Sequence, residues 1–128
     1  MSGSIFLLES TNNCAAEQYV YFYASPAKDM SDFANGRVTF KIEADNTGQQ
    51  ITFVVQDDYA QSSSILDISN YGFDANKAGI FQAISIPVSQ LTTQGIDLKK
   101  MDKLFQIFVV NSANDSFTYI ADVYWMLE

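Results

Sequence analysis

The chain has 128 residues, enough for one domain that buries roughly two-thirds of its unfolded surface. Its 15 acidic residues outnumber its 7 basic ones, and the resulting net charge of −8 disfavours nucleic acid and anionic membrane surfaces as partners. The sequence has no histidine and one cysteine, Cys14, which excludes an intramolecular disulfide, the usual zinc, copper and haem sites, and Ser-His-Asp or Cys-His catalysis within this chain.

The first residues do not resemble a targeting segment. No charged region, apolar stretch and small-residue cleavage site open the chain, and no apolar run reaches membrane-spanning length. We expect residues 1–4 (MSGS) to be a cloning remnant or the end of a linker. Residues 5–128 are then expected to form a single module taken from a longer protein.

The first half of the chain contains four strand-like runs. Ile5–Leu8 is a short apolar run that fits an edge strand. Tyr19–Tyr23 (YVYFY) is apolar on both phases, which indicates either a ligand or partner on one face or a strand buried between two sheets. Val38–Ala44 alternates cleanly, and a polar turn joins it to Ile51–Val55, so the pair predicts a hairpin.

The second half continues the pattern. Ile65–Ser69 and Ile80–Val88 are strand-like, and a long irregular crossover leads to Leu104–Val110 and Phe117–Trp125. Only a polar cluster separates the last two runs, which predicts a closing hairpin. About eight short strands without a long amphipathic helix predict an antiparallel β-sandwich or barrel. The long crossover favours a sandwich whose connections switch sheets.

Three segments carry a family resemblance. Asp29–Ile42 (DMSDFANGRVTFKI) resembles the opening of galactose-binding-like jelly-roll domains, and Tyr119–Trp125 (YIADVYW) resembles their closing strand. Between them, Ile84–Leu91 (ISIPVSQL) followed by Gln94–Leu98 (QGIDL) resembles their crossover. The chain is most similar to the carbohydrate-binding modules and C-terminal accessory domains of bacterial glycoside hydrolases that act on β-glucans.

The resemblance implies an all-β, galactose-binding-like jelly roll without catalytic activity. Such a module binds a polysaccharide or oligosaccharide and keeps a covalently linked hydrolase near a polysaccharide such as a β-glucan. It also implies a bacterial protein that is secreted, periplasmic or on the cell surface. A second hypothesis is a structural accessory domain that packs on a neighbouring catalytic domain without binding sugar, with an exposed apolar patch from Tyr19–Tyr23.

The same resemblance implies a structural calcium. An acidic residue near Asp122 often helps to hold this ion in the family, together with oxygens from the N-terminal region. Because calcium takes about 6–8 oxygen ligands, Glu9 and Glu17 are candidate partners. The alternative is that Asp122 accepts hydrogen bonds from the backbone or from a tyrosine.

Sugar recognition needs flat apolar surfaces beside polar groups that bond hydroxyls. The predicted stacking residues are aromatic, and Trp125 would be the strongest of them if exposed; the alternative for each is core packing. The predicted hydroxyl-binding residues are amides and an amine on outward phases, and convergence of the three glutamines in one cleft would favour sugar binding. The predicted carbohydrate-binding residues are Tyr59, Tyr71, Trp125, Gln56, Gln82, Gln106 and Lys41.

An enzyme is the third hypothesis. Glycoside hydrolysis needs two carboxylates roughly 5–10 Å apart across a cleft. Asp57 and Asp58 are adjacent, and neighbours on a strand end point in opposite directions, so we expect both to be solvated in a loop.

Overall fold

The structure is a computed structural model that describes residues 10–14, 17–110 and 116–127; for 10–14, 17–25, 110, 116 and 117 it describes the backbone alone. Residues 1–4 and the expected strand Ile5–Leu8 lie outside the described part. The described strands are β1 (Ser10–Cys14), β2 (Glu17–Lys28), β3 (Arg37–Ala44), β4 (Gln50–Phe53), β5 (Gln56–Asp57), β6 (Leu66–Asp67), β7 (Phe81–Pro87), β8 (Met101–Val110) and β9 (Ser116–Met126). Four single-turn 3-10 helices connect them: η1 (Ser31–Phe33), η2 (Ile68–Asn70), η3 (Val88–Gln90) and η4 (Leu98–Lys100). None of the helices in these ranges is long and apolar enough to cross a membrane.

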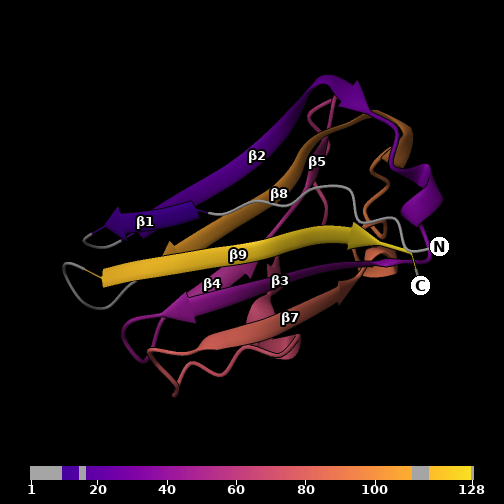
Figure 1. The fold of residues 1–128 in the computed structure, drawn as a ribbon. Coiled ribbons are helices and arrows are strands. Elements are labelled where there is room, and N and C mark those ends of the chain that lie inside the picture. Colours follow the sequence, from indigo (N-terminus) through magenta and orange to yellow (C-terminus); the bar gives the residue numbers. More distant parts are fainter. Residues whose placement is uncertain (1–9, 15–16, 111–115, 128) are drawn as a thin grey trace.

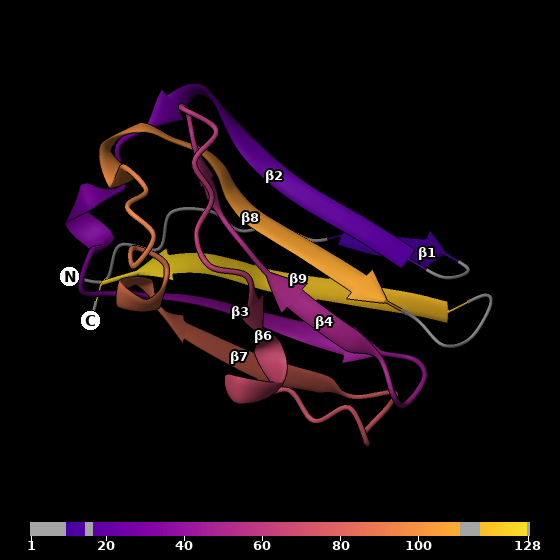
Figure 2. The same ribbon diagram turned by 180° about the vertical axis from the view of Figure 1, so that it is seen from behind.

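The strands form two antiparallel sheets that pack face to face (Figures 1 and 2). Sheet A is four-stranded, with the order β1-β9-β3-β7. Sheet B is five-stranded, with the order β2-β8-β4-β6 and with β5 beside β8. The expected antiparallel β-sandwich is confirmed.

The two predicted hairpins are wrong. β3 belongs to sheet A and β4 to sheet B, and likewise β8 belongs to sheet B and β9 to sheet A. Each of these turns therefore crosses from one sheet to the other. A clean alternation shows that a strand has one buried face, but two such strands can either pair edge to edge or face each other across the core. Here they face each other, and the expected sheet-switching connections are present.

Three phenylalanines fill the centre of the sandwich. Phe40 of sheet A lies with its ring centroid 5.9 Å from that of Phe53 and 5.0 Å from that of Phe105, both on sheet B. The Phe53 and Phe105 rings meet edge to face at 5.4 Å. Such pairs add about 0.5–1.5 kcal/mol beyond their buried area, so this trio fixes how the two sheets stack.

Gly36 marks the place where β3 begins beside the end of β9. Arg37 pairs with Met126, and a Cβ atom added to Gly36 would run into the backbone carbonyl oxygen of Met126. We expect Gly36→Ala to lower the free energy of unfolding by about 2–3 kcal/mol, because the backbone must shift to accept one methyl group. Urea unfolding measures this, and an unchanged midpoint would contradict the close approach.

Candidate functional site

The outer face of sheet B presents an aromatic ring in the middle of the sheet. β8 lies between β2 and β4. Ile107 and Val109 are buried in the core, so strand alternation places Gln106 and Phe108 on the opposite, outer face. Phe108 is 38% exposed. A phenylalanine that is exposed on an inner strand offers a flat apolar surface to a ligand.

Polar and aromatic positions surround this ring. Thr52 of β4 lies opposite Phe108 on one side, and Tyr19 of β2 lies opposite it on the other. Tyr21 of β2 is registered with Gln106. The run Tyr19–Tyr23 is thus part of β2, the edge strand of the same sheet, which lies next to β8. An exposed aromatic ring with a hydroxyl beside it is a combination that suits sugar recognition.

Sequence reasoning did not single out Phe108 within its apolar run. The signal that could have identified it is the two-residue period of Gln106 and Phe108 against Ile107 and Val109, with a glutamine marking the outward phase. The density of apolar residues in LFQIFVV concealed this period.

A turn held by a buried carboxylate lies at the end of sheet B. The side chain of Asp57 is 2% exposed, and its Oδ1 accepts hydrogen bonds from the backbone N–H groups of Tyr59 and Gln61, each at 2.9 Å. Its Oδ2 accepts a third, from the N–H of Asp97 at 2.9 Å. Asp57 therefore ties the turn to the crossover that leads into β8. The expectation that it is solvated is wrong, whereas Asp58 is exposed as expected.

The same turn presents Tyr59, whose side chain is 65% exposed. β5 precedes it and pairs with the first residues of β8, at Met101 and Lys103. The turn with Tyr59 therefore lies near the N-terminal end of β8, whereas Phe108 lies near the C-terminal end of the same strand. Because the backbone of this turn is held in place, only the side-chain torsions of Tyr59 lose freedom when a ligand binds.

We expect Asp57→Ala to lower the free energy of unfolding by about 2 kcal/mol, because three N–H groups lose a charged acceptor. Asp58→Ala is the matched control, and it should change stability by less than about 0.5 kcal/mol because its side chain is in solvent. Urea unfolding compares the two, with amide hydrogen exchange at Tyr59, Gln61 and Asp97 as a local readout. Equal stabilities of the two variants would contradict this role for Asp57.

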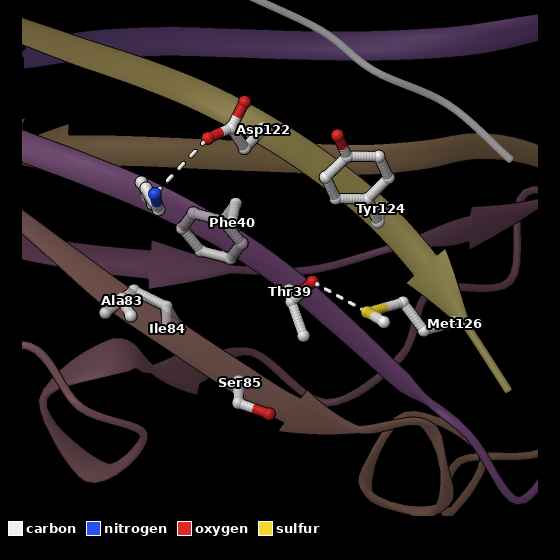
Figure 3. A pocket seen from close by; sticks show the side chains of 9 residues that line it. Thr39, Phe40, Ala83, Ile84, Ser85, Asp122, Tyr124 and Met126 are labelled. Carbon is white, nitrogen blue, oxygen red and sulfur yellow. Dashed lines mark hydrogen bonds and ion pairs between the residues drawn. The ribbon is translucent and has the colours of Figure 1, made fainter. Parts of the chain in front are cut away.

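The outer face of sheet A carries a hollow of about 420 Å³ (Figure 3). It spans three strands, since Thr39 and Lys41 come from β3, Ser85 from β7, and Asp122 and Tyr124 from β9. The Lys41 Nζ lies 3.5 Å from the Asp122 carboxylate, and both side chains are about half exposed. An exposed pair of this kind adds only about 0–1 kcal/mol to stability.

Asp122 has an unusual backbone conformation. Its φ is 56°, in the left-handed region. Thr39 pairs with Tyr124 but Lys41 pairs with Ala121, so β9 has one more residue than β3 at this place and forms a β-bulge. An ordinary L-residue loses about 1–2 kcal/mol in this conformation, and aspartate somewhat less. The bulge places the Asp122 side chain on the outer face with that of Tyr124.

Two predicted sugar-binding residues prove to be structural. Trp125 is 1% exposed, and its Nε1–H donates to the backbone oxygen of Leu104 at 3.0 Å, so it is not available for stacking. Gln82 is also buried: its Oε1 accepts from the N–H of Asp74 at 2.7 Å, and its Nε2 donates to the Asp74 oxygen at 3.1 Å. Both predictions were wrong because each polar group has a backbone partner inside the protein.

The remaining predicted residues are divided between the two sheets. Gln56 on β5 and Gln106 on β8 belong to sheet B, whereas Lys41 lies on the outer face of sheet A. Gln106 is buried, with the same exposed fraction of 8% as Gln82. Tyr71 is partly buried and packs against the core. The three glutamines do not converge, because Gln82 belongs to β7 of sheet A.

The described residues do not fit a calcium site at Asp122. In the described ranges no group of three or more His, Cys, Asp or Glu residues could hold a metal ion. The neighbour of the Asp122 carboxylate is an ammonium group, and calcium needs about 6–8 oxygens. Glu9 and the side chain of Glu17 lie outside the described part, so their predicted role as ligands stays a prediction.

Comparison with known proteins gives one family. The model described as "Carbohydrate binding domain 30" matches residues 9–126. No curated protein matches the chain. A family 30 carbohydrate-binding module of a cellulosomal cellulase of Clostridium thermocellum superposes with a TM-score of 0.63 and 16% identity, over 91% of this chain and 72% of that one.

Two further solved structures share the fold. A family 11 carbohydrate-binding module from Clostridium thermocellum, in complex with a β-1,3-1,4-mixed-linked tetrasaccharide, has a TM-score of 0.57 and 10% identity, over 99% of this chain and 87% of that one. An exo-β-agarase has a TM-score of 0.65 and 12% identity, over 96% of this chain and 22% of that one. At these identities the likeness establishes the fold alone.

Proposed function

Because the chain belongs to the carbohydrate-binding domain 30 family, we propose that this carbohydrate-binding module binds a neutral β-glucan along the outer face of sheet B. The family match confirms the resemblance found in the sequence. The observation that supports this location is the exposed ring of Phe108 on an inner strand, with the hydroxyl-bearing Thr52 opposite it on β4.

The chemistry of binding follows from these groups. The Phe108 ring stacks on the C–H face of a pyranose unit, and the hydroxyl of Thr52 bonds a sugar hydroxyl. No charge is needed for a neutral polymer, and the net charge of −8 repels acidic polysaccharides. Few contacts of this kind give an affinity between about millimolar and micromolar, that is, about −4 to −8 kcal/mol.

We expect no hydrolysis by the module itself. Hydrolysis needs two carboxylates roughly 5–10 Å apart across a cleft. Asp57 is buried and occupied by three backbone N–H groups, and Asp58 is its sequence neighbour. The module would instead hold a covalently linked glycoside hydrolase at its substrate, in a bacterial protein that works outside the cytoplasm. The family 30 module that shares the fold comes from a cellulosomal cellulase, which supports this role.

Affinity electrophoresis and calorimetry with laminarin, mixed-linkage β-glucan, xylan and agarose oligosaccharides test the proposal. We expect retardation and heat with at least one β-glucan, and no release of reducing ends after long incubation. The absence of binding to every member of the panel would overturn the carbohydrate ligand proposed here. Released reducing ends would overturn the non-catalytic role.

One observation favours the second hypothesis, a domain that packs on a neighbouring catalytic domain. Ile80 and Phe81 are consecutive and about half exposed, at the start of the edge strand β7. Phe81 is on sheet A, whereas Phe108 is on sheet B. If Ile80 and Phe81 only contact a linked domain, Phe81→Ala leaves sugar binding unchanged and weakens association with that domain when both are present.

A further inference from the structure

The hollow on sheet A lies on the opposite side of the sandwich from Phe108. The buried core separates the outer faces of the two sheets, so a ligand on one face does not occupy the other (Figures 1 and 2). The volume of the hollow, about 420 Å³, falls within the range of about 300–1,000 Å³ that is usual for small-ligand sites. The hollow is therefore large enough to be a site in its own right.

The charges in the hollow identify the class of ligand. Lys41 and Asp122 balance each other, so the hollow itself attracts neither an anion nor a cation strongly. The net charge of −8 further disfavours an acidic ligand. A carboxylate that accepts and an ammonium that donates, 3.5 Å apart and both open to solvent, match the adjacent hydroxyls of a neutral sugar.

The backbone at Asp122 supports a binding role. Left-handed non-glycine residues and β-bulges occur preferentially at functional sites, where they re-aim a side chain. Here the bulge brings Asp122 and Tyr124 to the same side of β9, around the hollow (Figure 3). Because an exposed ion pair stabilises the fold very little, stability alone does not account for an aspartate in this conformation.

We propose that this hollow is a second carbohydrate-binding site, in which Asp122 and Lys41 bond the hydroxyls of a neutral glycan and Tyr124 contacts its ring. The ligand class rests on the proposed function of the module. With one site on each sheet the module is bivalent, and it can contact two neighbouring polysaccharide chains at once.

The test is a titration of the 15N-labelled module with a β-glucan oligosaccharide, followed at the amides of Lys41, Ser85 and Tyr124. We expect saturable shifts there, separate from those around Phe108. Asp122→Gly removes the carboxylate and keeps the bulge, because glycine adopts a positive φ freely. It should weaken binding at the hollow by about tenfold or more. The shifts around Phe108 and the melting temperature should stay the same.

Two further variants complete the design. Lys41→Met tests the same site without touching the bulge and should also weaken binding at the hollow. Glu43→Gln lies on the outer face of β3 outside the hollow and is the matched control, with no expected effect on either site. Hollow amides that stay unmoved while those around Phe108 saturate would overturn the second site and leave the proposed function intact. An unchanged hollow affinity in Asp122→Gly would do the same, and no shift on either face with any glucan would overturn both proposals.

Discussion

Replacing Phe108 by alanine is expected to lower the affinity of the sheet B face for a β-glucan oligosaccharide by about tenfold or more. Aromatic contacts contribute about 0.5–1.5 kcal/mol beyond the area they bury, and a loss of about 1.4 kcal/mol is a factor of ten. Because the ring is already 38% exposed, the free energy of unfolding should fall by less than about 1 kcal/mol. Calorimetric titration gives the first quantity and urea unfolding the second.

Phe81→Ala is a closely matched control. It removes the same ring from a position that is 48% exposed, but on sheet A and outside its hollow. We expect its affinity to equal that of the wild type, and Phe108→Trp to retain binding because it keeps a flat apolar surface. If Phe108→Ala and Phe81→Ala bind equally well, the glucan does not bind on the sheet B face.

Trp125→Ala is expected to have the largest effect on stability. Truncation of a buried tryptophan costs about 3–5 kcal/mol through lost contacts and the cavity left behind. Trp125 lies on β9 of sheet A, packs edge to face on Phe33 at 6.3 Å, and donates its Nε1–H to the Leu104 oxygen on β8 of sheet B. It therefore fastens one sheet to the other. Thermal unfolding should show a melting temperature roughly 10–20 °C lower.

Trp125→Phe separates the ring from the hydrogen bond. It keeps most of the apolar contacts but leaves the buried Leu104 oxygen without its donor, at a cost of about 1–3 kcal/mol. Both variants should bind sugar normally wherever they remain folded. A Trp125→Ala protein with native stability and lost sugar binding would instead support the role as a stacking platform that the sequence suggested.

The sequence predicted the class of fold because the strand pattern is local. Val38, Phe40 and Ile42 are buried on one side of β3, as their alternation requires. The partner of each strand is not local. The turns after Ala44 and after Val110 have the residues of a hairpin turn, yet each crosses between sheets, because packing of both apolar faces in one core decides the pairing.

The candidate site was harder to predict, for two physical reasons. The extra residue at Asp122 reverses the inward and outward alternation of β9. Val123 and Trp125 therefore point into the core, whereas Tyr119 and Ala121 lie on the other face of the strand. No sequence period reveals an insertion of one residue. Polar side chains also find backbone partners that only the fold supplies, as Gln82 does with Asp74.

Stacking of a β-glucan on the ring of Phe108 can be observed through intermolecular nuclear Overhauser effects. In a sample saturated with a β-glucan oligosaccharide, we expect contacts between the C–H protons of a sugar ring and the aromatic protons of Phe108. Measurable binding without contacts to Phe108, with all sugar contacts on other residues, would contradict this stacking.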